Sequence, residues 1–124
     1  MTTLELKTKL DSFRHSTQLH QYKSVGDCHL YLSNGCKFFH ELYDISWLLD
    51  IIFDFLHDTS WHPLDSTIWT VEKQHYGLLD IRGKTMLGKL LYEQYDIEQS
   101  FPLDEFTLFN GLYKAYLPME VYYE

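Results

Sequence analysis

Two neighbouring stretches of the chain carry hydrophobic residues at helical spacing. The stretch from Trp47 to Leu56 is apolar at nearly every position except Asp50 and Asp54, so it predicts a central helix buried in the core. Ser46 precedes it, and a serine hydroxyl can accept hydrogen bonds from the free N–H groups of a first helical turn. The shorter stretch from Cys36 to Asp44 predicts an amphipathic helix just before it.

The N-terminal part of the chain is less regular. Met1 to Phe13 mixes leucines with charged residues at a spacing that predicts an opening helix. Gln18 to Val25 predicts a short strand or an irregular extended segment, and His29 to Leu32 alternates only weakly. The Asn34-Gly35 pair is typical of a turn or of the start of a helix.

The second half of the chain favours strands. After a loop predicted for His57–Asp65, β-branched and aromatic residues predict extended segments at Thr67–Val71, Gly77–Ile81, Leu87–Ile97, Phe106–Phe109 and Leu112–Leu117. The segment from Leu87 also fits a short helix, but Gly88 favours a strand.

Two short motifs divide these strands. Arg82-Gly83-Lys84 predicts a turn, and Asn110-Gly111 is the dipeptide most typical of a two-residue hairpin. Helices followed by hairpin-linked strands predict an α+β fold. We expect one domain, residues 1–124, with N-terminal helices and a central buried helix packed on an antiparallel sheet of about four strands.

The composition agrees with one packed core. Of the 124 residues 45% are hydrophobic and 17% aromatic, enough apolar surface to fold without disulfides or metals. The two cysteines, Cys28 and Cys36, could pair, but a chain without a secretory signal favours free thiols, so we expect both as packing residues. No apolar run reaches the ~20 residues of a membrane helix, and the N-terminus lacks the basic leader and apolar block of a secretory signal. We therefore expect a cytoplasmic protein. We also expect no cofactor.

The net charge of −8 argues against direct binding to nucleic-acid phosphates. The acidic residues gather toward the C-terminus, where Lys114 is the only basic residue after Glu93. A protein partner with a basic surface is therefore expected.

Five short motifs occur in an order that resembles a family of small bacterial proteins of uncharacterised function, often found on mobile elements. They are Asn34-Gly35, the Tyr43–Ile52 run, Ile68-Trp69, Phe101-Pro102-Leu103, and Leu117-Pro118-Met119-Glu120 with Tyr122. The chain departs from the family pattern at Asn34, at Gln99-Ser100 and at Met119. The resemblance implies a shared fold and a genomic setting but no mechanism.

Several polar residues could form a metal site. Cys36, His40 and Asp44 are four residues apart and could present a thiolate, an imidazole and a carboxylate on one helix face. The simpler interpretation is a packed cysteine beside two solvated side chains, since one helix cannot easily converge ligands two turns apart. Asp50, Asp54 and Asp58 could likewise hold a divalent cation or form the solvent-facing line of a buried helix.

Two histidines, His57 and His62, flank Trp61 and could act in acid–base chemistry. No nucleophile stands near them in sequence, and surface histidines are the simpler interpretation. The chain has no phosphate-binding glycine loop, no Gly-x-Ser-x-Gly and no His-Glu-x-x-His motif. An enzyme, for example a metal-dependent hydrolase with a site of dispersed His and Asp residues, remains the alternative hypothesis.

The leading hypothesis is a non-enzymatic binding protein. Carboxylates and tyrosines together make a plausible protein-binding surface, although ordinary strand packing would also explain the tyrosines. In a mobile-element setting, one version is an inhibitor that competes for the basic nucleic-acid channel of a CRISPR-like host defence complex. A homodimer through a tyrosine-rich sheet edge is also possible. The predicted partner-binding residues are Glu93, Glu98, Asp104, Glu105, Tyr113, Tyr116, Glu120 and Tyr122.

Overall fold

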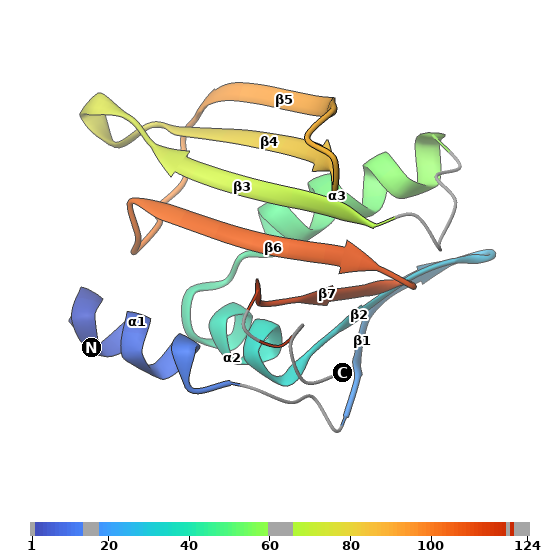
Figure 1. The fold of residues 1–124 in the computed structure, drawn as a ribbon, viewed down its shortest axis with the longest axis horizontal. Helices are drawn as coiled ribbons and strands as arrows, with labels where there is room; N and C mark the ends of the chain where they lie inside the picture. Colours follow the sequence, from blue (N-terminus) through green and yellow to red (C-terminus); the bar gives the residue numbers. More distant parts are fainter. Residues whose placement is uncertain (1, 14–17, 60–65, 119, 121–124) are drawn as a thin grey trace.

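A computed structural model describes residues 2–13, 18–59, 66–118 and 120. It has three α-helices and seven β-strands in this described part (Figure 1). In chain order the elements are α1 (Thr3–Asp11), β1 (His20–Val25), β2 (Cys28–Leu32), α2 (Asn34–Tyr43), α3 (Ser46–Thr59), β3 (Thr67–Lys73), β4 (Leu79–Thr85), β5 (Leu90–Ile97), β6 (Glu105–Gly111) and β7 (Lys114–Tyr116), with a short 3₁₀ turn, His75–Gly77, between β3 and β4.

The strands form one mixed sheet in the order β1-β2-β7-β6-β3-β4-β5. All neighbours are antiparallel except β2 and β7. The parallel pair is held by N–H groups of Tyr31 and Ser33, which donate to the carbonyls of Tyr113 (2.7 Å) and Ala115 (3.0 Å). The α+β class is thus confirmed, but the prediction of about four antiparallel strands understates the sheet, because the β1–β2 hairpin joins it through this long-range parallel pairing.

The central helix is confirmed as a core element. In α3, Leu48, Leu49, Ile52 and Phe53 are each at most 2% exposed, because apolar side chains repeat at helical spacing on one side of it. The helix begins at Ser46, but the serine is not shown to cap it. The Asp44 carboxylate instead accepts a hydrogen bond from the Ser46 N–H at 3.3 Å.

Both α2 and α3 pack on the same face of the sheet. Phe39 of α2 packs against Phe106 of β6 with tilted rings whose centroids are 4.5 Å apart, and Phe55 of α3 meets Trp69 of β3 edge-on at 5.5 Å. The opening helix α1 packs beside α2, where Phe13 just beyond it contacts Phe38. In Figure 1, α3 lies behind β3 and β4, while α1 lies below the first half of β6.

Two predicted turns are wrong. Arg82-Gly83-Lys84 lies inside β4, where Gly83 is needed because a Cβ there would stand 2.8 Å from the Trp69 ring. Asn110-Gly111 is part of β6, and the two-residue turn is Leu112-Tyr113, with φ of 52° and 64°. Packing of the strand against β3 fixes this register against the local preference, since non-glycine residues rarely take positive φ.

No helix within the described ranges is long and apolar enough to cross a membrane. The thiols of Cys28 and Cys36 are free, and Cys36 is fully buried in the core. The packing role predicted for Cys36 is thereby confirmed.

Candidate protein-binding face

The face of the sheet opposite α2 and α3 is defined by the alternation of side chains along β3. Trp69 and Val71 are buried toward the helices, whereas Ile68 and Thr70 are half-buried and point the other way. The strand registers carry this alternation across the sheet. We call the second surface the open face; its side chains include those of Tyr31, Ile68, Thr70, Glu72, Arg82, Glu93, Glu105, Thr107, Phe109 and Tyr116.

Charged side chains from four strands gather at one end of the open face, which we call the acidic end. Arg82 on β4 lies 3.5 Å (Nη1 to Oε1) from Glu72 on β3 and 3.8 Å (Nε to Oε2) from Glu93 on β5. Glu105 on β6 stands directly opposite Glu72. Tyr95 lies under the Arg82 guanidinium and donates a hydrogen bond to Glu93, which raises the pKa of Tyr95. Two of the three carboxylates in this group pair with its one guanidinium, and Glu105 adds a further negative charge, so the surface carries excess negative charge.

Aromatic and aliphatic side chains occupy the other end, which we call the aromatic end. Phe109 on β6 pairs with Tyr116 on β7, their rings edge-on with centroids 6.0 Å apart. Ile68 on β3 stands opposite Phe109, and Tyr31 on β2 stands opposite Lys114 on β7. All five side chains are half-buried. Half-exposed rings on a regular sheet offer a rigid apolar contact surface.

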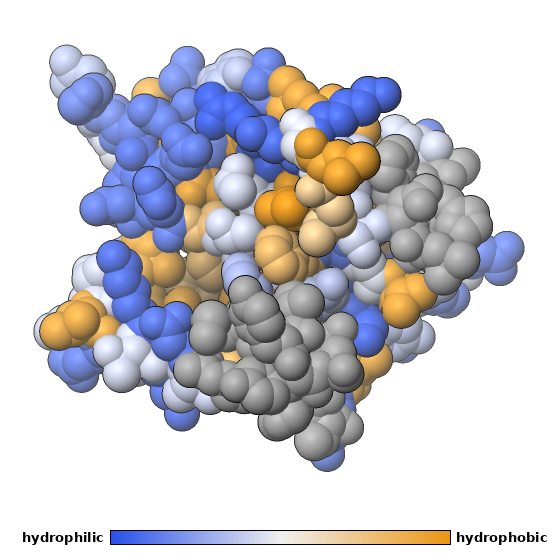
Figure 2. All heavy atoms as spheres, in the orientation of Figure 1, coloured by the Kyte–Doolittle hydropathy of each residue, from blue (hydrophilic) through white to orange (hydrophobic). Residues whose placement is uncertain are grey.

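Figure 2 views the molecule from this side, since α3 is the more distant layer in the same orientation. Hydrophilic residues gather over the upper strands, and paler and hydrophobic residues lie toward the centre. The two ends of the open face therefore differ in chemistry.

Most of the predicted partner-binding residues lie on the open face or beside it. Glu93, Glu105 and Tyr116 are on it, and Tyr113 is in the turn between β6 and β7, where its ring meets His29 edge-on at 5.5 Å. Glu98 and Asp104 are exposed acids near the acidic end. Glu120 is buried, and Tyr122 lies outside the described residues.

Glu120 corrects the prediction of an exposed C-terminal carboxylate. It is 1% exposed, so it is not part of an accessible surface. Its Oε1 accepts hydrogen bonds from the Ser33 hydroxyl (2.5 Å) and the Leu117 N–H (2.9 Å), and its Oε2 accepts from the Gly35 N–H (3.3 Å). The anion therefore binds the N-terminus of α2, where free N–H groups and the helix dipole favour negative charge.

Five residues of the open face are not among the predicted partner-binding residues: Glu72, Arg82, Tyr31, Ile68 and Phe109. The alternation around Trp69 was a signal for Ile68 and Glu72, because every second residue of a half-buried strand faces outward. The Arg82-Gly83-Lys84 motif predicts a turn, whereas the structure places Arg82 within β4, between two carboxylates.

The three potential metal ligands on α2 do not converge. Cys36 is fully buried in the core, where burial and, secondarily, the nearby Glu120 raise the pKa of its thiol. His40 Nδ1 accepts a hydrogen bond from the Ile45 N–H at 3.2 Å and lies 3.9 Å from Asp44 Oδ1. No group of three His, Cys, Asp or Glu side chains in the described part of the chain could hold a metal ion.

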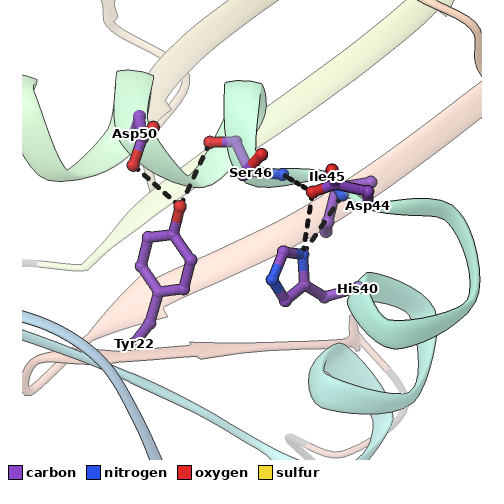
Figure 3. Close-up of polar contacts among 6 residues, drawn as sticks. All are labelled: Tyr22, His40, Asp44, Ile45, Ser46 and Asp50. Atoms are coloured by element: carbon purple, nitrogen blue, oxygen red, sulfur yellow. Dashed lines mark hydrogen bonds and ion pairs between the residues drawn. The ribbon is translucent and has the colours of Figure 1, made fainter.

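A polar network joins β1 to α3 (Figure 3). The Tyr22 hydroxyl donates to Asp50 Oδ1 at 2.8 Å and lies 3.4 Å from the Ser46 carbonyl oxygen. Burial and the Asp50 hydrogen bond raise the pKa of Tyr22. Lys23 Nζ lies 3.8 Å from the same Asp50 oxygen, and the His40 ring meets the Tyr22 ring edge-on at 5.5 Å. The phenol and carboxylate bind each other, which indicates a structural role.

The remaining candidates lie apart from one another. Asp54 and Asp58 are exposed on α3, whereas Asp50 is bound to β1. His57 Nδ1 lies 3.3 Å from Asp58 Oδ1 on the surface. The predicted His62 lies outside the described residues.

A family model covers most of the chain. The model of the "Family of unknown function (DUF6876)" matches residues 4–121. No curated protein and no solved structure matches the chain. The geometry of the described residues is therefore the basis for any functional conclusion.

Proposed function

The chain belongs to DUF6876, a family of unknown function, and we propose that it is a protein-binding module that engages a partner with a basic surface through the open face of its sheet. The observation that carries the proposal is the gathering of half-exposed rings and carboxylates on the sheet face opposite α2 and α3. Antiparallel sheets often leave one face to solvent, but such a face does not require this concentration of Phe and Tyr.

The two ends of the open face suit different steps of recognition. Tyr and Phe rings are enriched in protein interfaces, where they bury a large area at little entropic cost. The acidic end would attract basic partners during approach, because complementary charge raises the association rate. The net charge of −8 extends this attraction beyond the contact itself. Binding should therefore weaken as salt concentration rises.

Crosslinking followed by affinity purification from the source cells tests the proposal. We expect basic partner proteins whose recovery falls when Tyr116 is changed to Ala, by about 30-fold if the ring is an interface hot spot worth about 2 kcal/mol. Changing Glu98 and Glu105 to Gln should slow association and reduce its salt dependence. The matched control, Asp54→Asn with Asp58→Asn, removes the same charge from α3 and should leave recovery unchanged. Equal recovery with all three variants would refute the proposal.

A further inference from the structure

The first half of β6 has a sheet edge that β7 does not cover. β7 pairs with β6 only at Phe109, Asn110 and Gly111. Continuing that register would place Pro118 opposite Thr107, where proline has no N–H to donate. The pairing of β7 with β6 therefore ends before Pro118, and Figure 1 shows β7 stopping about midway along β6.

The backbone groups left free can be assigned from the registers. The Lys73 N–H donates to the Asp104 carbonyl at 2.8 Å, so alternate residues of β6 from Phe106 to Leu108 point their backbone groups toward β3. Thr107 and Glu105 point theirs the other way. Within the described residues neither has a backbone partner on that side.

A groove runs along this free edge. Its volume is about 300 Å³, enough for one or two apolar side chains. Its walls come from α1, from the start of β6 and from the segment after β7. The lining residues are Lys7, Leu10, Asp11, Leu103, Glu105, Phe106, Thr107, Leu117 and Pro118. Figure 2 shows a hollow with a hydrophobic interior on the same side, between α1 and the upper strands.

We propose that an extended segment of the protein partner adds as a strand to the Glu105–Thr107 edge, with apolar side chains in the groove and basic side chains at its rim. An unpaired edge is a template for strand addition, in which backbone bonds give affinity and pockets select alternate side chains. The charged residues that line the groove are Asp11 and Glu105 against Lys7, and the whole chain carries a net charge of −8. This charge balance selects a basic segment. The inference rests on the proposed protein-binding function and names the contact that the partner makes.

The premise can be tested on the free protein. Amide hydrogen exchange followed by NMR should show slow exchange at Phe106 and Leu108, whose N–H groups face β3, and fast exchange at Thr107. Equal protection at all three positions would show that the edge is already occupied and would overturn the inference.

Binding can be tested with synthetic peptides of roughly ten residues, a common strand length. The probe alternates Val and Lys. One control alternates Val and Glu, and a second is the probe N-methylated on every other residue, which removes the hydrogen bonds along one edge. We expect the probe alone to shift the amide signals of Glu105 and Thr107. Shifts elsewhere, or binding by either control, would overturn the inference, as would dimerisation of the free protein through this edge.

Two variants complete the test. Thr107→Pro removes the free N–H without removing a bond to β3, and should weaken probe binding about tenfold, roughly the value of one backbone hydrogen bond. If that variant fails to fold, Asp11→Lys with Glu105→Lys should abolish binding of the basic probe, while Asp54→Lys with Asp58→Lys should not. Unchanged binding to the folded edge variants would overturn the inference.

Binding of the native partner to the Tyr116→Ala and Thr107→Pro variants distinguishes the open-face proposal from the strand-addition proposal. Sensitivity to Tyr116→Ala together with indifference to Thr107→Pro would leave the open face standing and overturn strand addition. Sensitivity to both would support both. A partner indifferent to both would overturn the proposed function itself.

Discussion

Replacement of Glu120 tests how the end of the chain is anchored to α2. The carboxylate is 1% exposed and accepts three hydrogen bonds, from the Ser33 hydroxyl and from the N–H groups of Gly35 and Leu117. The residue lies 87 positions from Ser33 in sequence, so it holds together segments that have no local reason to meet. There is also no spare room, because a Cβ on Gly35 would stand 2.5 Å from Leu117 Cδ1.

The two simplest substitutions should differ in magnitude. Glu120→Gln keeps Oε1, which accepts two of the bonds, but turns an amide NH₂ toward the Gly35 N–H. The hydrogen bond from the Gly35 N–H is lost, and two N–H donors then face each other. This should lower the free energy of unfolding by about 1–3 kcal/mol. Glu120→Ala loses all three bonds and leaves buried donors unpaired. Part of this loss is offset because the variant no longer has to bury a charged group. We therefore expect the free energy of unfolding to fall by about 3–5 kcal/mol.

Urea denaturation followed by circular dichroism measures both changes, as shifts in midpoint at constant slope. The matched control is Glu98→Ala, an exposed glutamate near the end of β5, which should change stability by less than about 0.5 kcal/mol. A Glu120→Ala variant as stable as the Glu98→Ala control would refute the anchoring role. So would a Gln variant that is less stable than the Ala variant.

Three other predictions follow from buried contacts. Gly83→Ala should destabilise the protein by about 1–3 kcal/mol, because its Cβ would stand 2.8 Å from the Trp69 ring; an unchanged urea midpoint would contradict the packing described. Tyr22→Phe should cost about 1 kcal/mol by removing the hydrogen bond to Asp50. Because the folded-state pKa of Tyr22 is raised above its usual 10.0, its contribution is complete below pH 10.0 and is lost as pH rises further, so stability should fall less in this variant than in the wild type between pH 9 and 11; an identical fall would contradict it. The Cys36 thiol is fully buried and has a raised pKa, so it should react with a thiol reagent only at the rate of unfolding. Rapid labelling of Cys36 itself in native buffer would count against its burial.

The sequence by itself determined the elements whose pattern is local. Apolar spacing from Trp47 to Leu56 predicted α3, and the β-branched and aromatic run at Thr67–Val71 predicted β3, because neighbouring residues in one helix or strand share one environment. The same locality explains the α+β class and part of the candidate site. Glu93, Glu105 and Tyr116 were found because they are acidic or aromatic residues in strands.

Only the tertiary structure decided how distant segments meet. Strand β2 pairs with β7, more than 80 residues later, and no local pattern encodes such a pairing. The same assembly moved the hairpin turn from Asn110-Gly111 to Leu112-Tyr113, since packing between strands outweighed the turn preference. It also buried Glu120, which composition alone had assigned to the surface. The physical reason is that backbone preferences are set by adjacent residues, whereas register and burial depend on which surfaces the folded chain brings together.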